Sequence, residues 1–104
     1  MVLQEETIEL RRKREKKELV LNHQVNGEAF ISSPSPLWKN IVLSNFNRIH
    51  RGDITISQLL IIMKDKDISF TQHDNLVKYP VIECLHFIAK VSNIKFDLKE
   101  EKNQ

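Results

Sequence analysis

Glycine, cysteine and long apolar runs are scarce in this sequence, and each shortage excludes a class of protein. The 104 residues contain two glycines and one cysteine. Two glycines are too few for a glycine-rich phosphate-binding loop, and no G-x-G-x-x-G, phosphate-loop or G-x-S-x-G motif occurs. The single Cys84 excludes an internal disulfide framework and favours a reducing compartment. No apolar run approaches the roughly eighteen residues of a spanning helix. We therefore expect a protein of the cytoplasm and nucleus with no membrane partner.

The residues that usually carry catalysis or bind metals are dispersed along the chain. Four histidines occur singly, and none forms an H-x-x-x-H pattern; C-x-x-C is also absent. Cys84 and His86 are two residues apart, so on a helix they point to different faces. The sequence therefore predicts no enzyme, with no catalytic residues, no metal, no cofactor and no small-molecule substrate.

The charge is nearly balanced overall but concentrated near the N-terminus. The net charge is +2, and only the stretch from Arg11 to Lys17 is locally basic, with six basic residues and Glu15. A domain that neutralises many phosphates is more uniformly basic than this. A nucleic-acid partner is therefore not the preferred interpretation.

The first segment, roughly Glu5 to Asn22, is predicted to form a long charged helix, and it contains "IELRRKREKKELVLN", residues 8 to 22. It contains strong helix formers and neither glycine nor proline, and Glu5, Glu6 and Glu9 are expected near the positive, N-terminal end of the helix dipole. Its apolar residues gather at the two ends without a continuous stripe. We therefore expect that this helix does not pack as an ordinary core element.

The rest of the chain predicts a linker, a helical module and a tail. Residues 23–36 are rich in serine and proline and are interpreted as a flexible linker, which can also hold a short strand or a docking segment at residues 29–31. Residues 37–95 follow helical periodicity, and residues 96–104 form a charged tail that is expected to fray. The β-branched runs "ITI" and "LLII" leave a strand as the alternative within the module. The helical spacing favours an all-α fold of three to four short helices.

Several residues mark the expected helix boundaries in the module. Pro36 starts one helix, Gly52 ends it, Thr55 or Asp53 caps the next, and Pro80 is expected to divide the last helical stretch into two. Trp38 is interpreted as a packing residue at a helix start. The expected inward-facing residues are Leu37, Ile41, Val42, Asn45, Phe46, Ile49, Ile56, Leu59, Leu60, Ile62, Met63, Val81, Leu85, Ile88 and Val91.

Two stretches resemble the importin α family, and they occur in the family's order. "TIELRRKREKKELVLNHQV" resembles the importin-β-binding segment, which reads roughly V-E-L-R-K-x-K-R and then L-L-K-R-R-N-V after a short gap. "IIMKDKDISFTQHDNLVKYPVIECLHFIAK" resembles the first armadillo repeat, where D-N-I-I precedes an apolar helix. In the first stretch the matching residues are Ile8, Glu9, Leu10, Arg11, Arg12, Leu19, Val20 and Val25.

The resemblance implies a non-enzymatic adaptor of nuclear protein import, with a basic helix of residues 1–22, a linker of residues 23–36 and an armadillo-like module of residues 37–95. Its partner is then an importin-β-like receptor. The family's upstream arginines, its K-R-R-N group and its W-x-x-x-N pairs are missing here. A second interpretation is a small helical regulator, viral or phage-like, whose basic helix contacts nucleic acid or an acidic protein. The expected partner-binding residues are Ile8, Leu10, Arg11, Arg12, Lys13, Arg14, Lys16 and Lys17.

Overall fold

The fold was obtained as a computed structural model, which describes residues 7–98. Four α-helices make up this part of the chain, α1 (Ile8–Asn22), α2 (Ser35–Arg51), α3 (Ile56–Asp65) and α4 (Asp74–Ser92), with a 3-10 turn η1 (Glu28–Phe30). Among the described residues the sheet-like pairing is limited to one isolated antiparallel bridge between Ile31 and Phe70. The predicted all-α fold class is therefore confirmed.

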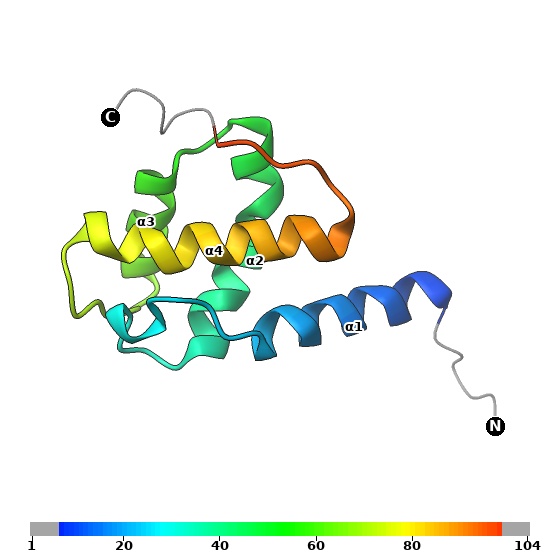
Figure 1. The fold of residues 1–104 in the computed structure, drawn as a ribbon, viewed down its shortest axis with the longest axis horizontal. Helices are drawn as coiled ribbons and strands as arrows, with labels where there is room; N and C mark the ends of the chain where they lie inside the picture. Colours follow the sequence, from blue (N-terminus) through cyan, green and yellow to red (C-terminus); the bar gives the residue numbers. More distant parts are fainter. Residues whose placement is uncertain (1–6, 99–104) are drawn as a thin grey trace.

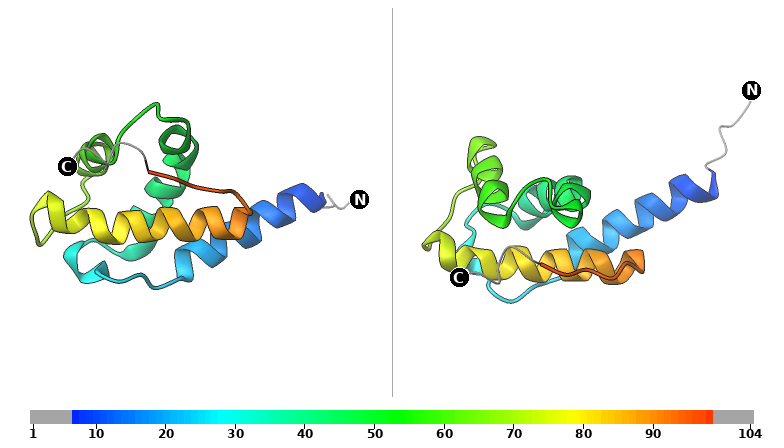
Figure 2. Two further views of the ribbon diagram at one scale, coloured as in Figure 1. Left: turned by 45° about the horizontal axis from the view of Figure 1, so that its top comes forward. Right: turned by 90° about the horizontal axis from the view of Figure 1, so that it is seen from above.

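Helix α4 lies at the centre and contacts every other helix (Figure 1). Helix α1 runs antiparallel beside α4, and α2 and α3 pack against α4 as well. In two further views α1 extends past the C-terminal end of α4, so that its first turns project from the body (Figure 2). This projection places the charged helix at one end of the molecule.

Local sequence signals fix the helix ends. Thr7 caps α1 by accepting a hydrogen bond from the backbone N–H of Leu10 at 3.1 Å. Gly52 ends α2 with a φ of 82°, a conformation that favours glycine. Thr55 and Gln58 form a reciprocal capping box at the start of α3. The expected end of α2 at Gly52 and the cap of α3 at Thr55 are confirmed.

The expected division at Pro80 is wrong, because α4 continues through this proline. A proline inside a helix loses one backbone hydrogen bond and costs about 3 kcal/mol. Here Val77 and Val81, on either side of Pro80, are both fully buried. Burial of the two flanking valines offsets that cost, so tertiary packing overrides the local break.

The predicted separation between the charged helix, a linker and a helical module is also not what the structure shows. Val20 at the end of α1 is 1% exposed, and Val25 and Ile31 in the expected linker belong to the same apolar core. Ser32 donates a backbone hydrogen bond to Ser69, and Thr71 donates one to Phe30. Residues 20–31 are therefore part of the packed structure, and the core extends across the boundary that composition suggested.

Most of the inward-facing residues were identified correctly from the helical spacing. Val42, Leu59, Leu60, Val81, Leu85 and Ile88 are fully buried, while the expected core residue Leu37 is 57% exposed. Ile62 and Val91 are half-buried. Helix α2 starts at Ser35, one residue before the expected Pro36, and Leu37 lies in its first turn on the solvent side, so its assignment to the core is wrong.

The start of the C-terminal tail returns over the body instead of fraying. After α4, residues 93–98 run back above α4 (Figure 2). Phe96 packs against Phe46, with ring centroids 5.4 Å apart, and also contacts His50 and His86. The remainder of the expected tail, residues 99–104, and residues 1–6 of the expected basic segment lie outside the described residues.

Candidate functional site

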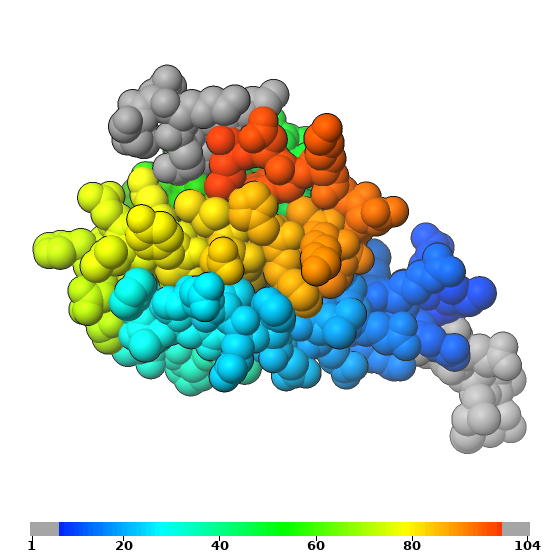
Figure 3. Space-filling model, viewed as in Figure 1, coloured from blue at the N-terminus to red at the C-terminus, as the bar shows by residue number. Residues whose placement is uncertain are grey.

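The outer part of α1, by which we mean residues 8–19, is a highly exposed stretch of helix. Among residues 8–19 every side chain is exposed except Lys16, which is half-buried. The two apolar residues of the expected site, Ile8 and Leu10, are 68% and 54% exposed. The space-filling view shows this helix protruding at one end (Figure 3). A helix in this position offers most of its circumference to a partner.

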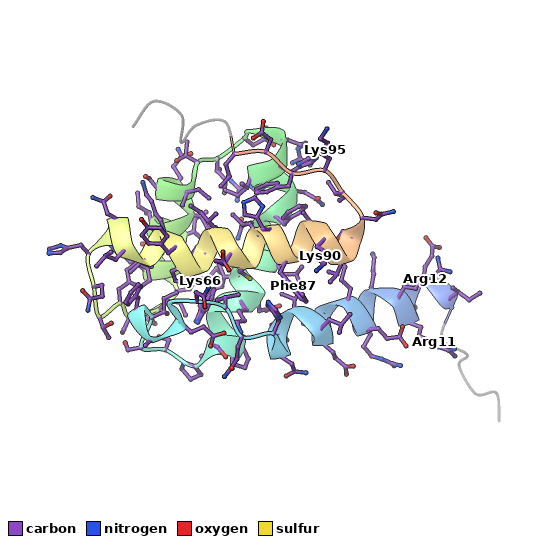
Figure 4. All side chains as sticks on the ribbon, in the orientation of Figure 1. Arg11, Arg12, Lys66, Phe87, Lys90 and Lys95 are labelled. Atoms are coloured by element: carbon purple, nitrogen blue, oxygen red, sulfur yellow. The ribbon has the colours of Figure 1, made fainter. Side chains whose placement is uncertain are left out.

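The basic residues of the expected site are distributed around α1, as the sequence predicted. Lys16 turns inward, and its Nζ donates a hydrogen bond to Ser92 Oγ at the end of α4, at 3.1 Å. Arg11 and Arg12 lie at the outer end of the helix (Figure 4). The exposed members are Arg11, Arg12, Lys13, Arg14 and Lys17.

A shallow groove runs between α1 and α4. Leu19 contributes its apolar wall on α1, and Phe87 and Val91 contribute the wall on α4. His23 stacks on Phe87 with parallel rings 3.7 Å apart, which closes the inner end. The groove is also lined by Arg12, Lys13, Glu15, Lys16, Glu18 and Asn22, so it carries both signs of charge.

A buried ion pair anchors the base of α1. Lys39 of α2 is 1% exposed, and its Nζ contacts a carboxylate oxygen of Glu28 at 2.6 Å. The same ammonium donates to the backbone carbonyl of His23, immediately after α1, and Glu28 accepts from the N–H of Val25 at 2.9 Å. These bonds fix residues 23–28 against α2, so α1 leaves the body in a defined direction.

Cys84, the single cysteine of the chain, is buried in the core. Burial raises the pKa of the Cys84 thiol from 9.0 to about 12, partly opposed by the positive charge of Lys39, and a neutral buried thiol is a poor nucleophile. Within residues 7–98, no group of three His, Cys, Asp or Glu side chains is arranged to hold a metal ion. None of the helices there is long and apolar enough to cross a membrane.

Comparison with known proteins identifies no relative of this chain. No family model matches the chain, and neither a curated protein nor a solved structure matches it. The site must therefore be interpreted from its own chemistry.

Sequence reasoning missed the residues that position α1. Lys39 lies next to Trp38 on the inward side of α2, and a lysine among apolar neighbours at a buried helical phase is a signal for an internal ion pair. Its partner, Glu28, is eleven residues earlier in a segment interpreted as a linker. The contact of Phe87 with His23 depends on how α1 docks, so the helical spacing of the last helix does not reveal it.

Proposed function

We propose that this protein is a non-enzymatic adaptor that binds an importin-β-like transport receptor through the outer part of α1, and that it acts in the cytoplasm and nucleus. The observation that carries the proposal is the exposure of an ordered basic helix around most of its circumference. Such a helix suits a receptor that encloses it with acidic walls. The resemblance of residues 7–25 to the importin-β-binding segment supplies the receptor class.

Because the inner end of α1, residues 20–22, packs against the core through Val20, a partner can contact only part of this helix. Val20 and Val25, which match apolar positions of the family segment, are buried in the protein's own core. A receptor therefore meets residues 8–19 unless the inner turn undocks. Together with the missing upstream arginines, this shorter contact predicts a complex in the micromolar range, weaker than one made by a full family segment.

The acidic residues within α1 favour a protein over a nucleic acid as the partner. Glu9, Glu15 and Glu18 are exposed among the basic side chains. A uniformly negative backbone of phosphates is repelled by these carboxylates, whereas a protein surface can pair with both signs. The nucleic-acid interpretation has no comparable observation in its favour.

A titration with conservative substitutions tests the proposal. Arginine forms two hydrogen bonds with one carboxylate, whereas lysine provides a point charge. Replacing Arg11 and Arg12 together by lysine should weaken binding to a purified importin-β-like receptor about tenfold. Binding of the unchanged protein should also weaken steeply with added salt. Equal affinity for both proteins, or binding that salt leaves unchanged, would reject the proposed helix–receptor contact.

A further inference from the structure

One face of α1 has a pattern that complements itself. Ile8, Arg12, Glu15 and Leu19 follow at spacings of four, three and four, which places them along one side of the helix. All four are exposed, and Ile8 and Leu19 are 68% and 55% exposed. This face borders the groove between α1 and α4, where Leu19 lies near Phe87. We call these four residues the α1 stripe.

We infer that the α1 stripe is the interface of a symmetric antiparallel dimer of this chain. When two copies of α1 are aligned in opposite directions, Ile8 of one copy faces Leu19 of the other. In the same register Arg12 faces Glu15. Each pairing occurs twice under a two-fold axis, because in an isologous interface residue i contacts j and j contacts i.

Charge selects this register over the alternatives. A parallel pairing sets Arg12 against Arg12 and Glu15 against Glu15, so like charges oppose each other. Shifting the antiparallel helices by one heptad sets Leu19 against Glu15, which places an apolar side chain against a carboxylate. The antiparallel register with Ile8 opposite Leu19 is the one that matches apolar with apolar and basic with acidic.

The shape of the molecule permits the arrangement. The body is attached at the inner end of α1, and the outer end projects from it (Figure 1). Two helices that overlap over residues 8–19 in opposite directions therefore keep their bodies at opposite ends. Ile8 of the second copy then reaches the apolar end of the groove, which is lined by Leu19 and Phe87. Figure 4 shows Phe87 between α4 and α1.

The proposed dimer is independent of the proposed receptor binding, although Arg12 takes part in both contacts. Exposed ion pairs contribute little each, so association depends mainly on the Ile8–Leu19 contacts and is expected to be weak. A receptor with acidic walls then competes with the second copy for α1. Self-association would hold the helix covered at high protein concentration.

Charge reversal with crossed mixing tests the dimer in the full chain. Sedimentation equilibrium of the 12.3 kDa protein should show a mass that rises towards the dimer value as its concentration increases. Arg12→Glu alone sets two carboxylates against each other in both polar contacts, and Glu15→Arg alone sets two guanidinium groups against each other there. Either single variant should associate at least tenfold more weakly than the unchanged protein.

The decisive sample is a mixture of the two single variants. In a heterodimer of the two variants, one polar contact pairs two introduced side chains and the other pairs two original ones, and each joins a carboxylate to a guanidinium. The mass should therefore return to the value of the unchanged protein. Both residues are exposed, and equal melting temperatures of the variants would establish that the fold is intact.

Three results would overturn the inference. The first is an unchanged protein that remains monomeric up to about a millimolar, where its affinity would be negligible. The second is association of the single variants like that of the unchanged protein. The third is failure of the mixture to associate.

Discussion

Lys39 Nζ lies 2.6 Å from Glu28 Oε2, and this ion pair joins helix α2 to the segment following α1. The lysine side chain is 1% exposed and the glutamate side chain is 24% exposed. Because Lys39 also donates to the carbonyl of His23, one buried ammonium holds two points of the segment from which α1 projects. The direction of the candidate binding helix thus depends on a contact in the interior.

Breaking this ion pair should destabilise the fold. Glu28→Gln leaves the Lys39 ammonium buried beside an uncharged amide, and the partial exposure of Glu28 moderates the loss to about 2 to 3 kcal/mol. Urea unfolding of the two proteins measures the difference. Asp53→Asn is the matched control, because its pair with Arg51 is exposed, and it should cost less than about 1 kcal/mol. Equal effects of the two substitutions would show that the buried pair has no special role.

Cys84 should make stability fall in alkaline solution. Burial raises the pKa of its thiol from 9.0 to about 12, so the folded state favours the neutral form. This contribution is complete below pH 9 and is lost as the pH rises towards 12, by about 1.4 kcal/mol per pH unit. Unfolding free energies of the unchanged protein and Cys84→Ala, measured across that range, should converge. Parallel pH profiles for the two proteins would contradict the assigned burial effect.

Two leucines that the sequence assigned to the core should respond differently to truncation. Leu85 is fully buried, so Leu85→Ala should cost about 2 to 4 kcal/mol. Leu37 is 57% exposed, and Leu37→Ala should change the stability by less than about 0.5 kcal/mol. Thermal or urea unfolding distinguishes them. A cost for Leu37→Ala comparable with that of Leu85→Ala would place α2 in a different rotation.

Removing the N-terminal part should damage the remaining fold. A chain of residues 32–104 lacks Val20, Val25 and Ile31 from the core and lacks both oxygen partners of Lys39. We expect it to lose cooperative thermal unfolding, because apolar surface is exposed and a charge is left buried without a partner. A cooperative melt at the temperature of the full chain would instead restore the domain boundary that the sequence suggested.

The sequence was informative wherever structure is determined locally. Helical spacing identified Val42, Leu60 and Ile88 as core residues, and Gly52 and Thr55 marked helix boundaries because their effects act within a few residues. The helix break expected at Pro80 is wrong, because the local cost of this proline is offset by tertiary packing that the sequence does not show.

Contacts between distant segments could not be predicted. The bridge from Ile31 to Phe70, the stack of His23 on Phe87 and the pair of Lys39 with Glu28 all depend on how the helices assemble. The exposure of the basic residues on α1 was expected from their even distribution. The docking of its last turn through Val20 was not, because a single buried valine creates no apolar stripe.

The central claim is that the outer part of α1 binds an acidic receptor, and charge reversal tests it most directly. Calorimetric titration of a purified importin-β-like receptor should give a Kd in the micromolar range for the unchanged protein, and no detectable binding for the variant with Arg11→Glu and Arg12→Glu. A control with Lys66→Glu and Lys95→Glu changes the net charge equally on other elements and should bind like the unchanged protein. All three proteins should have similar melting temperatures. Equal affinity of the two charge-reversed variants, or no binding by the unchanged protein at tens of micromolar, would contradict the account.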